Sequence, residues 1–177
     1  MARLRKFVAY RALERPFTRK SKYNEKSYLK SVPSIVIARF NMGNPRREYP
    51  YRVYLRVKCA LQIRHNALES ARQTANRMME KAIGNTLYAM TLLVYPHHAL
   101  RENKLAAGAG ADRMSMGMSL SYGTVISLAA QLRVNQAVLR IDCDKVHLEL
   151  AKKALHRAST KLPCTCIVTV EEYKKKE

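Results

Sequence analysis

Hydrophobic and polar positions alternate most regularly over residues 51–63, and this alternation is the clearest structural signal in the chain. Successive residues of a strand point to opposite faces, so a period of two predicts a half-buried strand. The side expected in the core carries Val53, Leu55, Val57, Cys59, Leu61 and Ile63, and the basic, aromatic outer side carries Tyr54, Arg56, Lys58 and Gln62.

Shorter apolar runs bounded by turn residues predict further strands. They cover residues 34–40, 86–96, 124–134, 136–141 and 164–170, and a turn over 42–50 precedes the alternating strand. We expect the runs on either side of Asn135 and Gln136 to pair as a hairpin.

Apolar residues recur at three- and four-residue steps after the alternating strand, which predicts an amphipathic helix. Asn66 caps its start with Glu69 reaching back in a capping box, and Gly84 suits the left-handed position beyond its end. The expected core face is Leu68, Ala71, Ala75, Met78, Met79 and Ala82, with Arg72, Arg77 and Lys81 outside.

A second helix is predicted to begin at Asp144 and to stop before Pro163. Asp142 and Asp144 flank Cys143, and we interpret these acids as helix caps rather than metal ligands. The expected core positions are Leu148, Ala151, Leu155 and Ala158, while Lys152, Lys153, His156 and Arg157 lie largely outside.

The order strand–helix–strand occurs twice, over residues 51–95 and 128–170. It predicts an α+β fold, a two-layer sandwich of mixed or antiparallel sheet with both helices covering one face. We expect a basic N-terminal extension at 1–31, a single α+β domain at 32–170 with a long loop at about 101–123, and a charged C-terminal end at 171–177.

Basic residues greatly outnumber acidic ones: 33 Lys and Arg against 13 Asp and Glu give a net charge of +20. Such an excess costs self-repulsion unless a polyanion neutralises it, and phosphate contacts release counterions, so nucleic acid is the leading partner. An acidic membrane surface would fit the charge, but no suitable basic amphipathic helix is visible. Without a spanning segment or a secretory signal, we expect a cytosolic protein with no membrane partner.

Few residues are placed for catalysis or metal binding. Cys164 and Cys166 alternate on one face of a predicted strand, closer than zinc-ligand pairs and without a second pair, so we interpret them as structural. His97 and His98 lack a Cys, Asp or Glu partner at ligand spacing, which favours packing or phosphate contact. The "GAG" at 108–110 lacks the third glycine and the apolar helix of a dinucleotide fingerprint. We expect no catalytic residue, metal or cofactor.

The N-terminal extension interleaves cations with Tyr10, Phe17, Tyr23 and Tyr28. One interpretation is a solvated tail whose aromatic rings pin it to the domain. The charge density favours another, an arm that lies on phosphates while its rings stack on bases or sugars.

Residues 97–123, "HHALRENKLAAGAGADRMSMGMSLSYG", carry a specific combination of motifs. The order R-x-N-K, AGADR, Gly-Met and aromatic-glycine resembles the universal large-subunit ribosomal protein sixteen family, in its archaeal and eukaryotic ("ten-e") branch. "VPSIVIARFNMGN" and "ALESARQTANRMMEK" resemble two further family segments, so the likeness covers essentially residues 1–170. Ser127 and Gln131 depart from a usual glycine and arginine, which removes a cation from position 131.

The resemblance implies a hammerhead-type α+β sandwich that binds large-subunit ribosomal RNA, joins late in subunit assembly and contacts neighbouring ribosomal proteins. It also implies that the loop reaches toward the peptidyl transferase centre and transfer RNA. Because a glycine- and alanine-rich loop gains little from ordering alone, we expect it to be mobile in the free protein. The expected RNA-binding residues are Arg3, Arg5, Lys6, Arg11, Arg19, Lys20, Lys22, Arg46, Arg47, His97, His98, Arg101, Lys104 and Arg113.

Two other hypotheses use the same basic surface. A free-standing RNA chaperone or RNA-processing enzyme should show a pocket with a pair of titrating groups. A DNA-compacting protein should bind duplex DNA as well as structured RNA.

Overall fold

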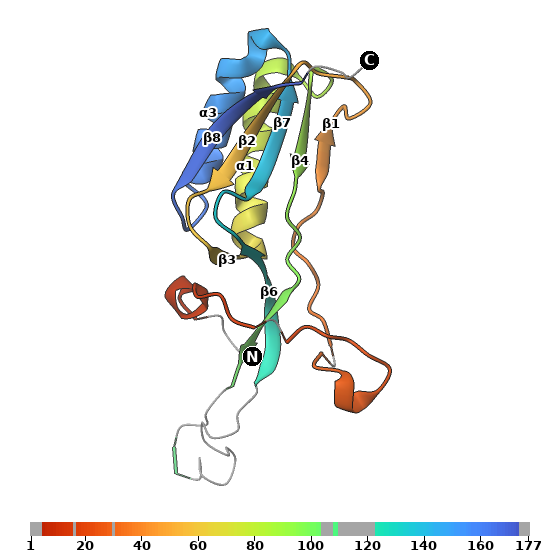
Figure 1. The fold of residues 1–177 in the computed structure, drawn as a ribbon, viewed down its shortest axis with the longest axis vertical. Helices are drawn as coiled ribbons and strands as arrows, with labels where there is room; N and C mark the ends of the chain where they lie inside the picture. The colour runs from red at the N-terminus through yellow and green to blue at the C-terminus, as the bar shows by residue number, and fades with distance from the viewer. Residues whose placement is uncertain (1–4, 16, 30, 104–107, 110–122, 174–177) are drawn as a thin grey trace.

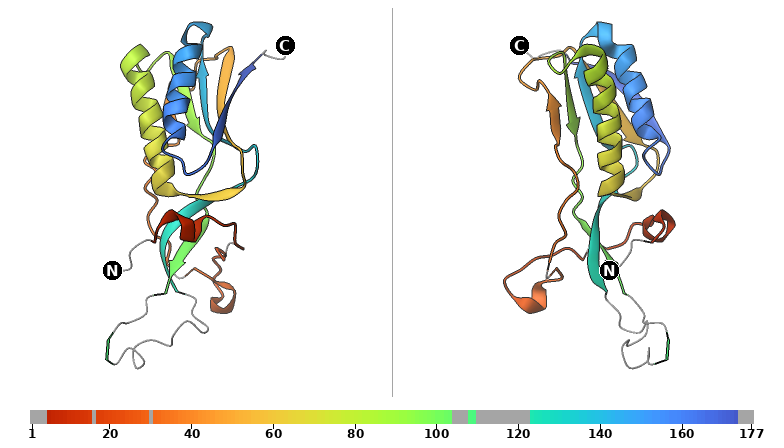
Figure 2. Two further views of the ribbon diagram at one scale, coloured as in Figure 1. Left: turned by 90° about the vertical axis from the view of Figure 1, so that its left-hand side faces the viewer. Right: turned by 180° about the vertical axis from the view of Figure 1, so that it is seen from behind.

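A computed structural model describes residues 5–15, 17–29, 31–103, 108–109 and 123–173. The body of the molecule has two layers (Figure 1). One layer is a five-stranded sheet in the order β1-β4-β7-β2-β8, and helices α1 (His65–Ile83) and α3 (Leu148–Ser159) lie across one face of it (Figure 2). The strands are β1 (Asn41–Gly43), β2 (Tyr51–Val57), β4 (Tyr88–Leu92), β7 (Ala137–Cys143) and β8 (Cys166–Glu172). The predicted α+β sandwich, with both helices on one face, is confirmed; its hammerhead description stays an expectation.

A second, three-stranded sheet projects from one end of the body (Figure 1). We call it the stalk; its strands are β3 (Leu61–Arg64), β6 (Thr124–Leu132) and β5 (His98–Glu102), in the order β3-β6-β5. We call residues 5–15 and 17–29 the arm, which contains the 3₁₀ turns η1 (Phe7–Tyr10) and η2 (Asn24–Lys26). The arm passes around the stalk, so that η1 and η2 lie on different sides of it (Figure 2). Every strand pairing between described residues is antiparallel.

The alternating segment 51–63 is not one strand, as predicted, but two strands in different sheets. β2 ends at Val57, and Lys58 next donates its N–H to the Thr165 carbonyl at 3.0 Å. Alternation persists across the break because Val57 and Leu61 are both buried, so the pattern alone does not reveal it. Gln62, expected on the outer side, is only 2% exposed because the arm covers it.

The predicted hairpin across Asn135 and Gln136 is wrong for a related reason. β6 pairs with β3 and β5 in the stalk, whereas β7 pairs with β2 and β4 in the body. Asn135 has a positive φ of 61° and donates its N–H to the Val57 carbonyl at 2.9 Å. Two of the crossings between the sheets, from β2 to β3 and from β6 to β7, therefore lie next to each other.

The strand predicted at 34–40 is also wrong, because β1 covers only Asn41–Gly43. Side chains of α1 take the place of a neighbouring strand: Val36 donates its N–H to His65 Nδ1 and Ala38 donates to Glu69 Oε2, both at 3.4 Å. The strands predicted at 86–96 and 164–170 are found as β4 and β8, the latter reaching Glu172.

The start of α1 differs from the prediction. Arg64 rather than Asn66 occupies the N-cap position, and it makes no side-chain cap bond. Glu69 completes no capping box because its buried carboxylate accepts Arg72 Nε at 2.8 Å and Nη2 at 2.6 Å. This ion pair explains why Arg72, expected outside, is only 8% exposed.

The end of α1 follows the prediction more closely. Gly84 has a φ of 74°, and its N–H donates to the Glu80 carbonyl at 3.0 Å. Ala82, expected in the core, is exposed in the last turn. No helix in the described ranges is long and apolar enough to cross a membrane.

α3 begins at Leu148, after the 3₁₀ turn η3 (Lys145–His147), rather than at Asp144. Its buried face includes the predicted Ala151, Leu155 and Ala158, and Leu148 is half-buried. The helix ends at Ser159, four residues before Pro163.

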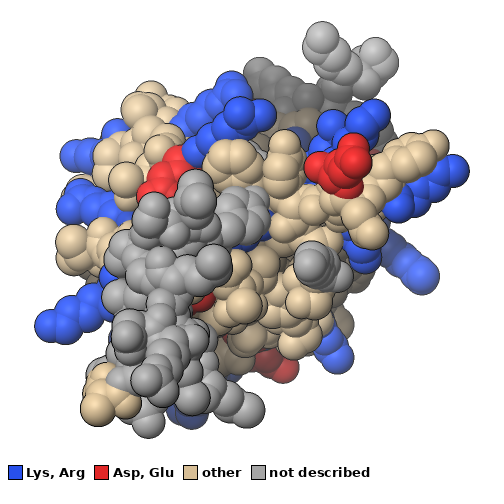
Figure 3. Space-filling view, turned by 90° about the horizontal axis from the view of Figure 1, so that it is seen from below, with Lys and Arg blue, Asp and Glu red and all other residues tan. Residues whose placement is uncertain are grey.

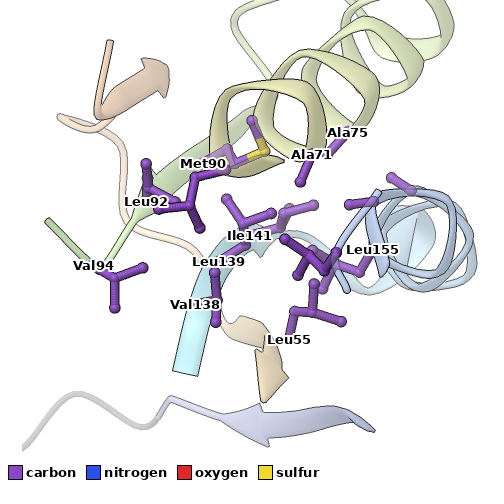
Figure 4. Packing of buried hydrophobic residues seen from close by; sticks show 14 of the residues in the cluster. Leu55, Ala71, Ala75, Met90, Leu92, Val94, Val138, Leu139, Ile141 and Leu155 are labelled. Carbon is purple, nitrogen blue, oxygen red and sulfur yellow. The ribbon is translucent and has the colours of Figure 1, made fainter. Parts of the chain in front are cut away.

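The core lies between the sheet and the two helices (Figure 4). Leu55 and Ile141 from the sheet meet Ala71 of α1 and Leu155 of α3, and all four are fully buried. Small alanines let the helices pack close to the large sheet side chains, and this burial of apolar surface stabilises the body.

Candidate nucleic-acid interface

Hydrogen bonds from the stalk to backbone carbonyls fix the arm, beside an apolar cluster of Tyr10 with Leu100 and Ala129. Gln62 of β3 donates its backbone N–H to the Arg11 carbonyl at 3.3 Å and its Nε2 to the Ala12 carbonyl at 2.6 Å. Gln131 of β6 donates Nε2 to the Glu14 carbonyl at 2.6 Å. The residue that replaces the usual arginine therefore binds the arm, and it brings no charge to this surface.

Arg101 of β5 holds the arm at two points. Its Nη2 donates to the Phe17 carbonyl at 2.7 Å and to the Tyr28 carbonyl at 2.9 Å. The rings of Phe17 and Tyr28 meet edge to face, with centroids 5.4 Å apart. These contacts make Arg101 an internal clamp that positions the arm.

The first described residues of the arm attach to the end of β5. Arg5 forms an ion pair with Glu102 at 2.7 Å, and Tyr10 donates its hydroxyl to the same carboxylate at 3.4 Å. Arg64 donates Nη1 to the Arg5 carbonyl at 3.4 Å. The hydrogen bond from Arg5 to Glu102 raises the pKa of the guanidinium above its ordinary value.

Besides Arg5, which is exposed but paired with Glu102, five of the predicted RNA-binding residues are exposed along the arm. They are Lys6, Arg11, Arg19, Lys20 and Lys22. Seen from below, Lys and Arg side chains surround this end of the molecule while acidic side chains show at few points (Figure 3). The arm thus presents exposed cations around the stalk, on a backbone that the stalk fixes. Arg3, Lys104 and Arg113, as well as most of the predicted loop, lie outside the described residues.

Arg46 and Arg47 do not join this surface. They lie in the turn after β1, at the end of the body opposite the stalk (Figure 1). Arg47 pairs with Asp144 at 2.7 Å and lies over the Tyr49 ring at 5.3 Å. The predicted residues therefore divide between two distant places.

The two histidines occupy different environments. His97 is exposed, and its ring centroid lies 4.5 Å from that of Tyr95. His98 lies in β5 with its side chain buried, and burial lowers its pKa, so the imidazole is neutral near pH 7. Its Nδ1 has no hydrogen-bond partner among the described residues. Only His97 is therefore placed to meet a phosphate.

A cavity of about 470 Å³ separates the arm from β5. Arg5, Glu14, Arg15, Phe17 and His98 contribute to its walls, and the guanidinium of Arg15 lies 5.3 Å from the centre of the Phe17 ring. Most of these groups already have partners within the arm or stalk. The cavity thus belongs to the junction that holds the arm.

Sequence reasoning missed the residues that anchor the arm, above all Gln62, Gln131 and Glu102. Gln62 was assigned to a solvated strand face, and nothing in the pattern indicates that another segment covers that face. The substitution of Gln131 for a usual cation was the available signal, because a neutral amide binds carbonyls in place of phosphates.

Of the two acids that flank Cys143, Asp142 is not a helix cap, whereas Asp144 occupies the N-cap position of η3. Asp142 is buried beside Arg140 and Arg52, at 3.2 and 3.9 Å, and burial raises the pKa of its carboxyl. Asp144 pairs with Arg47 and makes no side-chain cap bond. Both therefore serve internal charge pairing.

Cys164 and Cys166 lie on one side of the chain at the start of β8, as predicted, with their sulfur atoms 3.7 Å apart. The hydrogen bond from the Cys164 thiol lowers the pKa of Cys166 and raises that of Cys164. No group of three or more His, Cys, Asp or Glu among the described residues is arranged to hold a metal ion.

Comparison with known proteins adds to this geometry. The ribosomal protein L16p/L10e family matches residues 14–169. The large ribosomal subunit protein uL16 of Methanococcus maripaludis strain S2 is 42% identical over 97% of this chain and 96% of its own. The proteins of the same name from Methanocella arvoryzae and Archaeoglobus fulgidus are 44% and 39% identical, over 85% and 92% of this chain and 87% and 90% of their own. The chain belongs to the ribosomal protein L16p/L10e family.

Proposed function

We propose that this protein is a structural constituent of the large ribosomal subunit and that its arm binds large-subunit ribosomal RNA. The observation that carries the proposal is an exposed cationic arm, fixed to a folded stalk, in a chain of the L16p/L10e family. Because the family consists of ribosomal proteins, the expectation that the chain is not an enzyme is confirmed. Its partners are ribosomal RNA and neighbouring proteins on cytoplasmic ribosomes.

The arm is suited to phosphates in both charge and geometry. Lys6, Arg11, Arg19, Lys20 and Lys22 are exposed, while hydrogen bonds from the stalk hold the backbone that carries them. Holding the backbone in place reduces the entropy lost when RNA binds. Cations of this kind position RNA and do not read its sequence, so specificity comes from RNA shape.

We extend the proposal to the segment between β5 and β6. β5 leads away from the body and β6 returns to it, and the segment that joins them contains Lys104 and Arg113 (Figure 1). The family resemblance supports a position for this segment near the acceptor ends of transfer RNA and the peptidyl transferase centre, and late entry of the protein into the assembling subunit.

Sedimentation tests the main proposal. Tagged protein in a cell lysate should cosediment with large subunits on a sucrose gradient and be released only by high salt, because its contacts are electrostatic. A free-standing RNA chaperone or enzyme would instead remain near the top of the gradient at every salt concentration, and that result would overturn the proposal.

The arm itself is tested by the salt dependence of RNA binding. Lys20→Gln with Lys22→Gln should reduce the slope of log affinity against log salt by about 2, roughly one for each lost phosphate contact. The matched control is Lys145→Gln with Lys153→Gln, two exposed cations of η3 and α3 on the body. Equal slopes for the two pairs would show that the arm has no special role.

The segment between β5 and β6 needs a separate experiment. Replacing residues 105–121 with a glycine–serine linker should leave sedimentation unchanged but weaken binding of transfer RNA to purified ribosomes. Full transfer RNA binding by such ribosomes would contradict this part of the proposal and leave the arm's role intact.

A further inference from the structure

A groove of about 560 Å³ lies between the outer surfaces of α1 and α3. Its walls include Arg77 and Lys81 of α1 and, across from them, Arg157 of α3 and Lys161 just after it. Figure 2 shows the two helices side by side on the outside of the sheet. Arg77 and Lys81 lie in the last two turns of α1, whose first turn adjoins the stalk, so the groove is distant from the arm.

The four cations of the groove have no carboxylate partner among the described residues. Elsewhere on the same helices, Arg72 pairs with Glu69 at 2.6 Å and Lys152 pairs with Glu149 at 2.7 Å. Glu80 lines a neighbouring depression, but its carboxylate accepts a hydrogen bond from Asn76 at 3.1 Å. Four like charges around one groove repel each other, and an anionic partner removes that cost.

The floor of the groove is apolar. Met78 and Leu150 are half-buried, packed against the edge of the core, and both line the groove between the cations. A phosphate backbone presents no apolar side and would leave these side chains beneath charged groups. Met is also adaptable, so it can fit more than one apolar surface.

An amphipathic helix matches both features at once. An apolar stripe can lie on Met78 and Leu150 while acidic residues on its flanks meet the cations of the two walls. Arg77 and Lys81 are four residues apart on α1, one turn along the same side, and carboxylates three or four residues apart on a facing helix share that spacing.

We propose that the groove between α1 and α3 docks an acidic amphipathic helix of another protein. This goes beyond the RNA contact of the arm, because it assigns the opposite part of the body to a protein partner. The two sites differ in shape: the arm carries exposed cations along one chain segment, whereas the groove places cations on two walls around an apolar floor.

A designed peptide provides the test. A fluorescent helix of about 20 residues carries leucines at three- and four-residue steps flanked by glutamates, and its anisotropy reports binding to the full-length protein. Arg77→Glu with Arg157→Glu should weaken binding by about tenfold or more. Lys145→Glu with Lys153→Glu, the same charge change outside the groove, should alter binding far less.

Three further measurements decide whether the whole groove is used. Met78→Gln should weaken peptide binding, and circular dichroism checks that this variant keeps its fold. A peptide of the same composition in scrambled order should bind the wild-type protein poorly. A peptide with lysines in place of glutamates should bind the Arg77→Glu, Arg157→Glu variant, which shows that this variant folds and that charge sets the pairing.

Two results would overturn the proposal. Equal binding of the scrambled peptide, or equal loss in the control variant outside the groove, would indicate attraction by net charge alone. The groove would instead be assigned to phosphates if an RNA hairpin lost as much affinity as the peptide on Arg77→Glu and lost none on Met78→Gln. Neither result bears on cosedimentation with large subunits, so the proposed function is tested independently.

Discussion

In the body, Leu55, Leu139 and Ile141 are completely buried between the sheet and the helices. The arm is held to the stalk by hydrogen bonds from Gln62, Gln131 and Arg101 and by a small apolar cluster in which Tyr10 meets Leu100 and Ala129. Burial of a large apolar side chain contributes about 1.5–3 kcal/mol and needs no partner beyond the chain itself. A hydrogen bond to a carbonyl contributes about 1 kcal/mol net, because water offers the same bond. The body is therefore self-sufficient, while the arm is lightly fixed.

The charge distribution follows the same division. The arm carries exposed cations with few acids, so its own repulsion opposes the hydrogen bonds that fix it to the stalk. RNA phosphates would remove this repulsion and favour the arm's observed path. The body is therefore stabilised by its own core, whereas the arm would gain stability when it binds an anionic partner.

The largest expected effect comes from opening a cavity in the body. Leu55→Ala removes a fully buried side chain and should lower the free energy of unfolding by about 3–5 kcal/mol. Urea unfolding followed by far-ultraviolet circular dichroism measures this change. Val8→Ala, which truncates an apolar side chain of the arm that is 80% exposed, is the control and should have almost no effect. Similar losses for both would mean that arm and body are equally integral to the fold.

A smaller loss is expected at the buried ion pair of α1. Glu69→Gln leaves Arg72 buried without a counter-charge and should cost about 3 kcal/mol near neutral pH, again measured by urea unfolding. The hydrogen bond from Arg72 lowers the pKa of Glu69 below its ordinary value, although burial opposes this.

Because the pKa of Glu69 is lowered in the folded protein, the stability contributed by the ion pair depends on pH. A lowered carboxyl pKa contributes stability above the unfolded-state pKa of about 4.3, and this stability is lost as pH falls through the folded-state value. The difference between wild type and Glu69→Gln should therefore shrink between pH 5 and pH 3. A constant difference over that interval would contradict the assigned role of the pair.

The hydrophobic pattern of the sequence predicted the helix faces of the body correctly but did not reveal where the chain changes from the body sheet to the stalk. Leu68, Ala71, Ala75 and Met79 followed helical spacing because one apolar face meets one core, and the structure buries all four. The strand change between Val57 and Leu61 leaves side-chain alternation intact, so periodicity could not show it.

The candidate interface was predictable in part. The high density of Lys and Arg in the arm predicted that Lys20 and Lys22 are exposed, because a charged side chain is stable in water without a partner residue. Arg101 was equally cationic in sequence, but its role as a clamp depends on two carbonyls that lie 84 and 73 residues away along the chain. Contacts between distant segments leave no periodic pattern, and only the structure brings them together.

Arg101, the clamp that holds the arm, should affect the arm far more than the body. Arg101→Ala removes two hydrogen bonds to the arm and should expose the arm to trypsin while changing the urea midpoint of the body only slightly. Cleavage in the arm should become about fivefold to a hundredfold faster, in line with a local loss of about 1–3 kcal/mol. Arg133→Ala, at an exposed cation on the turn after β6, is matched in charge and should leave the cleavage rate unchanged. Equal cleavage in the two variants would show that Arg101 does not hold the arm.

The smallest expected effect is a response of the stalk to mild acid. Burial lowers the pKa of His98 in β5 and of His65, whose Nε2 lies 3.1 Å from the Ser127 hydroxyl of β6. Unfolded histidine titrates near pH 6.5, so a lowered folded-state pKa gives stability that is present above that pH and lost as pH falls through the folded value.

β7 contains no histidine, and the body's one buried histidine among the described residues, His65, begins α1 beside the stalk; His147 is half-buried and His156 is exposed. Between pH 7.5 and 5.5, amide hydrogen exchange corrected for its intrinsic pH dependence should therefore quicken in β5 and stay constant in β7. His98→Gln should reduce the response in β5, whereas His97→Gln, at an exposed position, should preserve it. An equal response in β7 would mean that stalk and body open together and would contradict a local effect of the stalk histidines. A response confined to β5 would place the boundary between them where the chain crosses from one sheet to the other.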